Sequence, residues 1–362
     1  MSGKEGHSYA PTSQATEQVV ESGEFVFAAS HLDHGHIFGQ VNGLLEAGGT
    51  LKWVYEPDPE KRQKFMETYP DSGVQAVNSL EQILEDSEVK LVAAAAVPSE
   101  RGPLGCQVMQ AGKDYFTDKC PFTSLEQLEQ TRKVVSETGQ KYLVYYSERV
   151  HVEAAWYADE LIQGGAIGDI VHMAITGPHR LSKPSRPEWF FKKAQYGGIL
   201  TDICSHQMDQ FLHYSRARDG EVLHARVENF ANADQPEFED FGEAVIQLDT
   251  GASCISRVDW FTPNGLSSWG DGRSLIVGTK GYLEIRKYLD VARSETGDRI
   301  FLVDGEKETE IECHGKVGFP FFGQLILDCL NRTENAMTQE HAFKAAELSL
   351  RAQVLADRQR DV

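Results

Sequence analysis

The first part of the chain alternates short apolar runs with stretches in which apolar side chains recur at helical spacing. The apolar runs predict strands over 25–29, 51–55, 91–97, 114–117 and 142–146. The stretches between them predict helices over 38–47, 59–69, 79–86 and 124–138, and one that ends at Met109. Strands that alternate with helices form a doubly wound parallel sheet, and such sheets bind ligands at the carboxyl ends of their strands. Residues 24–146 are therefore predicted to form an α/β domain of this kind.

The pattern changes after Arg149. A predicted helix over 151–163 is followed by β-rich runs with few helices between them. These runs predict strands over 170–176, 221–231, 243–248, 252–260, 273–277 and 282–286. A helix over 338–358 closes the chain. Because successive strands pair with their neighbours, residues 147–362 are predicted to form an α+β domain with a large, mostly antiparallel open sheet.

Residues 1–23 carry little apolar character, and they are expected to form a disordered or poorly ordered tail. The tail lacks the apolar core of a signal peptide. Elsewhere no apolar run approaches the roughly 20 residues that a membrane span needs. These features predict a cytoplasmic protein without a membrane partner.

Composition and charge narrow the possible partners. Among 362 residues, 41% are hydrophobic and 25% are charged, as in ordinary globular proteins. The net charge of −20 opposes binding to nucleic acid. Six cysteines are scattered without a C-x-x-C pair, which predicts reduced thiols and no disulfide framework.

The segment 196–209 carries the strongest chemical signal. Asp202 and His206 are four residues apart, so on one helix their side chains would project from the same face. A carboxylate beside an imidazole can act as an acid/base pair. The preceding glycines, Gly197 and Gly198, allow a left-handed turn or a close approach to a ligand. An amphipathic helix with a polar rim explains the spacing equally well. A lysine, Lys119, from a separate strand–helix junction favours the chemical interpretation.

Several motifs in one fixed order make the chain, from about Glu24 to its end, resemble the Gfo/Idh/MocA oxidoreductases. Their E-K-P motif resembles Asp118-Lys119-Cys120-Pro121, with an extra residue and with Asp for Glu. Their G-G-x-x-x-D-x-x-x-H motif is matched by Gly197, Gly198, Asp202 and His206. Further matches are Ala111-Gly112-Lys113 before the E-K-P strand and Gly164-Gly165-Ala166-Ile167-Gly168 at the start of the second domain.

The resemblance implies an N-terminal Rossmann domain for NAD and a C-terminal domain that binds substrate and often mediates oligomerisation. A homo-oligomer, dimer or tetramer, is therefore expected. The implied reaction transfers a hydride between nicotinamide and a hydroxyl carbon of a sugar, cyclitol or related polyol. The implied catalytic residues are Lys119, Asp202 and His206.

Further site residues follow from the same resemblance. Arg149, His179 and Arg180 are implied substrate contacts, together with Asp202 and His206. Trp189 and Pro98 are implied cofactor contacts, as is Lys119. For Arg149 a salt bridge is an equally good explanation, and Trp189 could belong to the core.

The cofactor loop departs from the family pattern. A Rossmann fingerprint requires G-x-G-x-x-G after the first strand, because glycines allow a tight turn and close approach to the pyrophosphate. Here the segment 28–39 has glycine only at Gly35 and Gly39. The side chains of Ser30, His31 and His34 would crowd the usual pyrophosphate position. Either the loop takes another course, with Gly35 near the helix start supplying amide donors, or dinucleotide binding is weakened or lost.

The second strand ends in an acidic segment, 55–58, which includes Glu56. A carboxylate at this position accepts hydrogen bonds from an adenosine ribose and repels a 2′-phosphate. The sequence therefore predicts NAD in preference to NADP, with Glu56 on the ribose and residues 30–35 on the pyrophosphate.

Four residues of the same loop also have the side chains of a zinc site: His31, Asp33, His34 and His36. Their order does not match a metal-binding motif of a fold that the rest of the chain supports. The histidines are interpreted as part of the cofactor loop, and no metal is predicted.

Three classes of function remain open from the sequence. The first is an NAD-dependent dehydrogenase of a sugar or polyol. The second uses tightly bound NAD for elimination or hydrolysis of a glycoside. The third is a non-catalytic sensor of a nucleotide or sugar. The intact lysine, aspartate and histidine favour an enzyme, whereas the altered glycine loop favours the sensor.

Overall fold

The computed structural model describes residues 11–360. The chain divides into two compact units. The Rossmann unit comprises the described residues up to Tyr145 together with Gly318–Ala342. The sheet unit comprises Tyr146–Val317 and the described residues from Phe343 onward. Within the described residues, the chain first passes from the Rossmann unit to the sheet unit between Tyr145 and Tyr146, close to the predicted change of fold at residue 147.

The Rossmann unit is built on a six-stranded parallel sheet with strand order β3-β2-β1-β4-β5-β6. The strands are β1 (Val26–Ser30), β2 (Thr50–Tyr55), β3 (Gln75–Ala76), β4 (Val89–Ala94), β5 (Asp114–Asp118) and β6 (Tyr142–Tyr145). All five residues of β1 are buried, as expected for a central strand covered on both faces. The order reverses at β1, so the β1 and β4 ends are where ligands bind in such sheets. The predicted doubly wound parallel sheet is confirmed.

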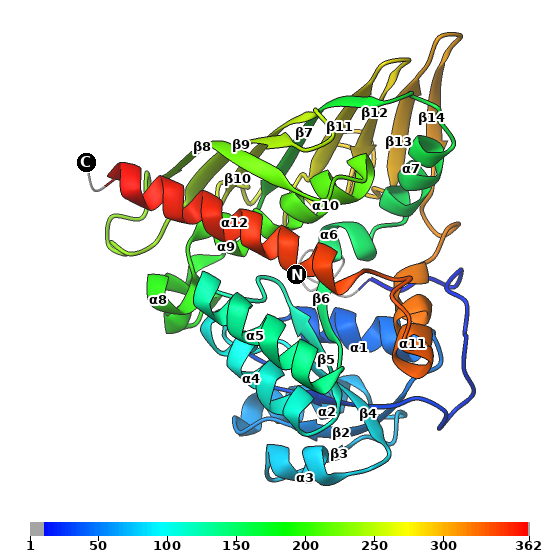
Figure 1. Cartoon of the computed structure of the whole chain (residues 1–362), viewed down its shortest axis with the longest axis vertical. Coiled ribbons are helices and arrows are strands. Elements are labelled where there is room, and N and C mark those ends of the chain that lie inside the picture. The colour runs from blue at the N-terminus through cyan, green and yellow to red at the C-terminus, as the bar shows by residue number, and fades with distance from the viewer. Residues whose placement is uncertain (1–10, 361–362) are drawn as a thin grey trace. The chain divides into compact units, whose positions relative to one another are not determined.

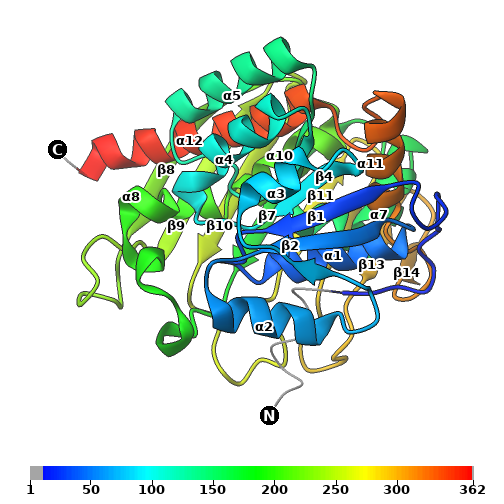
Figure 2. The ribbon, with the colours of Figure 1, turned by 90° about the horizontal axis from the view of Figure 1, so that it is seen from below.

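Helices connect these strands: α1 (His36–Glu46), α2 (Pro59–Thr68), α3 (Leu80–Glu85), α4 (Pro98–Gln110) and α5 (Leu125–Thr138). Helix α2 begins with Pro59 after its N-cap Asp58, whose carboxylate accepts two backbone N–H groups. Helix α3 begins with the predicted capping box of Ser79 and Gln82. Figure 2 shows β1 and β2 side by side with α2 nearby.

A C-terminal segment returns to the Rossmann unit, which departs from the predicted boundary at residue 147. Helix α11 (Pro320–Asn331) packs on α1, and the ring of Phe322 lies over Gly43. A Cβ atom at Gly43 would come within 2.3 Å of that ring, so only glycine allows this approach. Phe322 also contacts Phe116 and Tyr145 of the sheet. Aromatic packing explains why this segment joins a unit distant in sequence.

The N-terminal segment also departs from expectation. Residues 11–23 contain no helix or strand but are held by hydrogen bonds to the Rossmann unit. The backbone N–H of Val19 donates to Ala47 O at 3.0 Å, and Thr16 Oγ1 accepts from Phe319 N at 3.2 Å. The predicted poorly ordered tail therefore does not apply to these residues, because backbone partners tie them down. Residues 1–10 lie outside the described residues.

The sheet unit contains an eight-stranded sheet with strand order β14-β13-β12-β11-β7-β10-β9-β8. Its strands are β7 (Ile170–Pro178), β8 (Gly220–Glu228), β9 (Phe241–Leu248), β10 (Ser253–Asp259), β11 (Arg273–Gly278), β12 (Tyr282–Arg286), β13 (Arg299–Val303) and β14 (Glu308–Glu312). Strands β7 and β10 are parallel, and the other neighbouring strands in the described sheet are antiparallel. The predicted large, mostly antiparallel sheet is confirmed.

Helices cover one face of this sheet (Figure 1). They include α6 (Ser147–Val150), α7 (Glu153–Gln163), α8 (Lys193–Tyr196), α9 (Ile199–Asp202), α10 (Ser205–Ser215) and the long α12 (Gln339–Arg360), with two short 3₁₀ turns at Lys183–Ser185 and Glu188–Phe191. Along β10, Cys254 and Val258 are buried, whereas Ile255 between them is 45% exposed. This alternation places Ile255 on the outer face of the sheet. Among residues 11–360, no helix is long and apolar enough to cross a membrane.

Candidate active site

The loop between β1 and α1 crosses the carboxyl ends of three strands. The N–H of His31 donates to Tyr55 O at the end of β2, and the N–H of His34 donates to Ala95 O beyond β4. Gly35 is the N-cap of α1 with φ −62°, and no atom lies within 4 Å of a Cβ placed there. The glycine therefore gives room beside the helix N-terminus and is not required by its backbone angle. The Oγ of Ser30 is buried and has no hydrogen-bond partner among the described residues.

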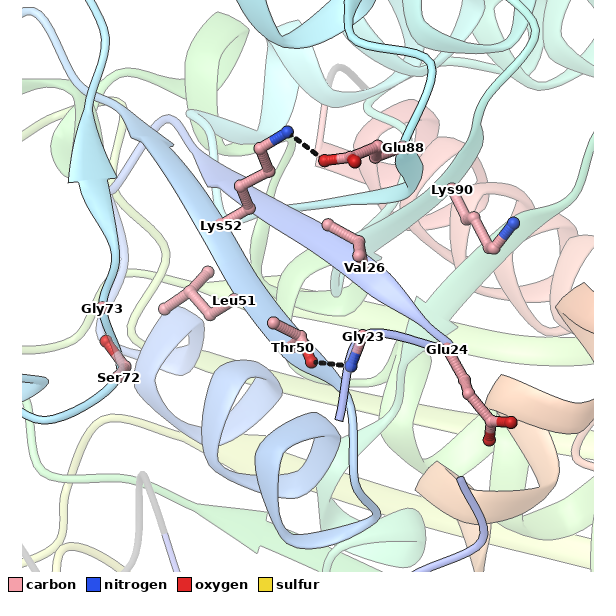
Figure 3. A pocket seen from close by; sticks show the side chains of 10 residues that line it. All are labelled: Gly23, Glu24, Val26, Thr50, Leu51, Lys52, Ser72, Gly73, Glu88 and Lys90. Atoms are coloured by element: carbon pink, nitrogen blue, oxygen red, sulfur yellow. Dashed lines mark hydrogen bonds and ion pairs between the residues drawn. The ribbon is translucent and has the colours of Figure 1, made fainter. Parts of the chain in front are cut away.

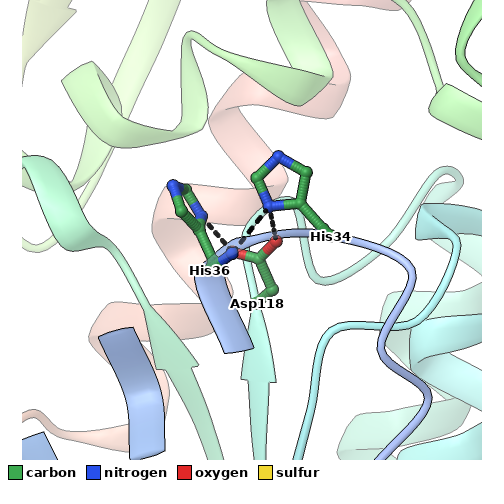
Figure 4. A group of neighbouring side chains, drawn as sticks. All are labelled: His34, His36 and Asp118. Carbon is green, nitrogen blue, oxygen red and sulfur yellow. Dashed lines mark hydrogen bonds and ion pairs between the residues drawn. The ribbon is translucent and has the colours of Figure 1, made fainter. Parts of the chain in front are cut away.

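Two histidines of this loop converge on one carboxylate (Figure 4). The Nδ1 atom of His34 lies 3.0 Å from Asp118 Oδ2, and Nδ1 of His36 lies 2.7 Å from Asp118 Oδ1. Arg101 approaches the same carboxylate, with Nη2 3.0 Å from Oδ2. Asp118 is the last residue of β5, so the cluster ties the cofactor loop to the end of that strand. His34 was predicted to contact the cofactor, whereas its Nδ1 faces Asp118.

The charges of this cluster do not require a metal ion. One ligand atom from each of His34, His36 and Asp118 lies within 4.8 Å of the others, a spacing that could hold a cation. The guanidinium of Arg101 already neutralises the carboxylate, and a divalent ion would add uncompensated positive charge to a buried site. The other loop residues with zinc-type side chains lie elsewhere: Asp33 pairs with Lys61, and His31 packs against Tyr55. The absence of a metal remains a prediction.

Burial and charge set the protonation of the cluster. Burial alone would raise the pKa of Asp118, but His36, Arg101 and His34 hold it well below its usual value. Burial and the adjacent His36 together lower the pKa of His34 to about 3, although Asp118 opposes them. Near neutral pH the cluster therefore contains an ionised Asp118 and an uncharged His34.

Lys119 follows β5 directly and is held by its backbone. Its N–H donates to Asp118 Oδ1 at 2.7 Å, and its carbonyl accepts from the Arg101 guanidinium. The guanidinium also donates to Ala96 O at 2.7 Å and to Cys120 O at 3.1 Å. The peptide bond between Lys119 and Cys120 is cis. Arg101 thus fixes the segment that carries the lysine, a role that its sequence position alone did not reveal.

Glu56 binds backbone amides in this structure. It is 2% exposed, and both of its carboxylate oxygens accept backbone N–H groups. Oε2 accepts from Leu32 N at 2.6 Å, and Oε1 accepts from Asp58 N at 2.9 Å. The carboxylate therefore holds the β1–α1 loop against the start of α2. The predicted contact between Glu56 and a ribose remains untested.

In the sheet unit the glycine pair has the predicted backbone role. Gly197 and Gly198 adopt φ 88° and 94°, in the region that favours glycine, and α9 begins immediately afterwards. Asp202 is the last residue of α9, whereas His206 is the second residue of α10. The two residues therefore do not share one regular helix, which corrects the simplest interpretation of their spacing. Both are buried, at 7% and 1% exposure.

Arg149 makes the salt bridge that the sequence left as an alternative. Its Nε and Nη2 atoms donate to the two oxygens of Asp209 at 2.6 and 2.7 Å. A bidentate pair of this kind is strong and geometrically specific. Arg149 lies in α6 and Asp209 in α10, so the pair fixes the helix that carries His206. A direct contact of Arg149 with substrate remains a prediction.

Two other predicted pocket residues, His179 and Arg180, directly follow β7. The ring of His179 lies 4.3 Å from that of Trp269, measured between centroids, and its Nδ1 lies 3.0 Å from Gly177 O. Arg180 Nη2 donates to the carbonyls of Pro263, Leu266 and Ser268 and so holds the loop before β11. Trp189 is half-buried in the second 3₁₀ turn. Their roles toward a ligand remain predictions.

Sequence reasoning missed a buried polar group beside these residues. Glu148 Oε2 accepts from Lys287 Nζ at 2.9 Å and from Gln207 Nε2 at 3.0 Å. His179 Nε2 lies 3.9 Å from the other oxygen of Glu148. Glu148 precedes Arg149, and Gln207 follows His206, which is the signal that could have drawn attention to them. This network links the end of β7 to the helix of His206.

A pocket of about 490 Å³ lies at the amino-terminal ends of β1 and β2, away from the strand ends that carry the β1–α1 loop (Figure 3). It is lined by Gly23, Glu24, Val26, Thr50, Leu51, Lys52, Ser72, Gly73, Glu88 and Lys90. These residues include the starts of β1 and β2, whereas doubly wound sheets bind ligands at the ends of their strands. Lys52 is paired with Glu88 at 2.5 Å and with Asp86 at 2.6 Å. The pocket is therefore not the candidate cofactor site.

Two family models match the chain in the order of its units. The model of the oxidoreductase family with an NAD-binding Rossmann fold matches residues 28–146. The model of the GFO/IDH/MocA C-terminal domain matches residues 156–284. The N-terminal domain is thus an NAD-binding Rossmann domain, despite its altered glycine loop.

Known proteins agree with this assignment. Two scyllo-inositol 2-dehydrogenases of Bacillus subtilis (strain 168) are similar: IolW, named for NADP⁺, is 26% identical over 42% of this chain, and the other, named for NAD⁺, is 27% identical over 56%. These matches span 42% and 57% of the relatives' own lengths. A crystal structure of a protein from Erwinia carotovora atroseptica SCRI1043, named as an oxidoreductase, is 45% identical with a TM-score of 0.89, over 92% of this chain and 99% of that one. The chain belongs to the Gfo/Idh/MocA family of oxidoreductases.

Proposed function

We propose that this protein is an NAD-dependent dehydrogenase that oxidises a hydroxyl carbon of a sugar, a cyclitol or a related polyol. The observation that carries the proposal is the family motif at Asp202 and His206, which are both buried in the sheet unit. The names of the two Bacillus subtilis relatives support a cyclitol as the first substrate to test. A buried carboxylate and imidazole at these positions can serve acid/base chemistry in an enzyme, whereas a sensor gains nothing from it.

The three proposed catalytic residues have different roles. His206 is the general base that takes the proton from the reacting hydroxyl. Asp202 orients the imidazole or accepts a neighbouring hydroxyl of the substrate. Lys119 donates to the reacting oxygen, so that its positive charge stabilises the alkoxide that forms as the proton leaves. The buried setting of these groups strengthens their electrostatic effect.

The Rossmann unit offers residues that fit the dinucleotide. The helix start at Gly35 and the unpaired buried Oγ of Ser30 suit an anionic pyrophosphate. We propose that His31, His34 and Pro98 border the same site and that Trp189 contacts the nicotinamide. The nicotinamide supplies the hydride acceptor when the cofactor is bound. No metal is needed for this chemistry.

A reduction assay tests the proposed function. The purified protein is incubated with NAD⁺ and a panel that contains scyllo-inositol, other cyclitols, aldoses and sugar acids. We expect formation of NADH with at least one polyol, measured by its near-ultraviolet absorbance. Binding of NADH in calorimetry without turnover of any polyol would instead favour the sensor. If the protein binds neither NADH nor NADPH, the cofactor assignment itself is wrong.

We further propose that two copies associate through the outer face of the eight-stranded sheet. Ile255, Ala174 and Leu275 are register partners across β10, β7 and β11, so their side chains form one apolar row. Ile255 and Leu275 are 45% and 37% exposed, an unusual exposure for a central part of a sheet.

Charge on this row should separate the copies. The double substitution Ile255→Arg and Leu275→Arg places positive charges on the face through which the two copies associate. These like charges repel each other across the interface, so we expect the variant to be monomeric in sedimentation velocity. Leu125→Arg, on a similarly exposed leucine of α5, is the matched control and should keep the wild-type assembly. A wild-type protein that is monomeric at all concentrations would contradict the proposal.

A further inference from the structure

The names of the two curated relatives do not indicate a choice between NAD and NADP, because one relative is named for NADP⁺ and the other for NAD⁺. In a Rossmann domain this choice depends on the group that meets the 2′ position of the adenosine ribose: a carboxylate for the hydroxyl, a cation for the phosphate. Glu56 is the residue that spacing predicts for this contact. Its two oxygens, however, are already bound by the amides of Leu32 and Asp58, and its side chain is almost fully buried.

We propose that Asp33 and Lys61 form the group that determines cofactor choice in this chain, with Asp33 as the carboxylate that receives the ribose 2′-hydroxyl. The inference rests on the proposed use of a nicotinamide dinucleotide. It deepens that function by naming a pair of residues that the family fingerprint does not contain.

The position of Asp33 is set by the backbone on both sides. Leu32 donates its N–H to Glu56, and His34 donates its N–H to Ala95 O, so the residue between them has a fixed place in the β1–α1 loop. The loop lies where β1 and β2 end, which is where the adenosine ribose binds in this fold. Unlike that of Glu56, the Asp33 side chain remains partly accessible, at 19% exposure.

Lys61 reaches the same place from the first turn of α2. Its Nζ lies 2.5 Å from Asp33 Oδ1, and its side chain is 38% exposed. Burial alone would lower the pKa of Lys61, but the hydrogen bond and charge of Asp33 raise it above its usual value. Lys61 is therefore protonated, and the negative charge of Asp33 neutralises its positive charge.

This pairing explains how one site can distinguish the two cofactors. A 2′-hydroxyl can donate to Asp33 Oδ2, because the ion pair with Lys61 uses Oδ1. A 2′-phosphate would bring negative charge next to Asp33 and Glu56, and the ammonium of Lys61 that could bind it is already paired with Asp33. Removal of the Asp33 charge should release Lys61 to bind the phosphate.

Three variants, compared with the wild type, test the proposal through cofactor affinity alone. Kd values for NADH and NADPH are measured by nucleotide fluorescence for the wild type, Asp33→Asn, Lys61→Met and the double variant. Wild type should prefer NADH. Asp33→Asn should bind NADPH about tenfold or more tightly than wild type, because Lys61 becomes free to pair with the phosphate. It should bind NADH a few-fold more weakly, because a neutral amide accepts a weaker hydrogen bond than a carboxylate does. The double variant should bind NADPH no more tightly than wild type, because the improvement acts through Lys61.

Two further variants separate this role from a general effect on the loop. Glu56→Gln should weaken both cofactors by a similar factor, because that carboxylate holds the backbone of Leu32 and Asp58. Lys64→Met, on the same helix, is the matched lysine control and should leave the ratio of the two affinities unchanged. Thermal melting establishes that each variant is folded.

The outcomes are distinct. An unchanged NADH/NADPH ratio in a folded Asp33→Asn protein overturns the inference, as does a switch of cofactor produced by Glu56→Gln alone. Tighter NADPH binding that persists in the double variant shows that Lys61 is not the phosphate partner and also overturns it. Loss of all dinucleotide binding in the wild type contradicts the proposed function itself. If the protein binds the cofactor but oxidises no polyol, the test of Asp33 and Lys61 remains valid, because it measures cofactor affinity and not turnover.

Discussion

Replacement of His206 by alanine is expected to lower kcat by about 10²–10⁴-fold, the usual contribution of a general base. His206 is buried at the start of α10, and alanine offers no group that can accept the proton. The effect should fall mainly on kcat, because the proton leaves the hydroxyl only as the hydride is transferred. Steady-state kinetics with the polyol that turns over in the reduction assay provides the measurement.

A second histidine of the same unit provides the control. His172 lies on β7, and its Nδ1 is 2.8 Å from Ser253 Oγ. His172→Ala should retain near-wild-type turnover, so the comparison separates loss of the base from loss of any imidazole. Turnover of His206→Ala within a few-fold of wild type would show that this residue has a structural role.

Replacement of Lys119 by alanine is expected to cost about 10²–10³-fold in kcat, as removal of a donor to a developing oxyanion usually does. The backbone of Lys119 is fixed by Asp118 and Arg101, whereas its side chain has no part in those contacts. The alanine variant should therefore keep the fold and the affinity for NADH. Stopped-flow kinetics under single-turnover conditions would show whether the loss lies in the chemical step.

Lys119→Arg tests the same role with the charge retained. A planar guanidinium does not place a point charge as an ammonium does, so partial activity is expected, between those of the wild type and the alanine variant. Lys90→Met changes an exposed lysine at the start of β4 and controls for the loss of one positive charge from a strongly acidic protein. Full activity of Lys119→Ala would exclude the proposed alkoxide contact.

The sequence predicted much of the architecture because local patterns suffice for it. A continuous apolar run such as 91–97 fits only a strand with both faces covered, and β4 is such a strand. The capping box at Ser79 and the proline at the start of α2 specify helix starts through contacts within one turn. The boundary of the Rossmann unit was harder to predict, because α11 joins it through aromatic packing between residues far apart in the chain.

The spacing of Asp202 and His206 shows a limit of periodicity. Four residues predict one helix face only if the helix is continuous, and the helix is interrupted at Ile203 and Cys204. The family resemblance was the stronger argument here, because several weak motifs in one order identify a family even where local geometry differs.

The sequence by itself determined the order of the two domains, the parallel and antiparallel character of their sheets and the family of the chain, since periodicity and short motifs are local properties. It also revealed the altered glycine loop. Only the tertiary structure decided the partners of the side chains in that loop. His36 meets Asp118 across 82 residues of sequence, Arg101 fixes the segment of Lys119, and Glu56 binds the amides of Leu32 and Asp58. A buried charge takes whichever partner the packed fold brings near, and spacing along the chain does not contain that information.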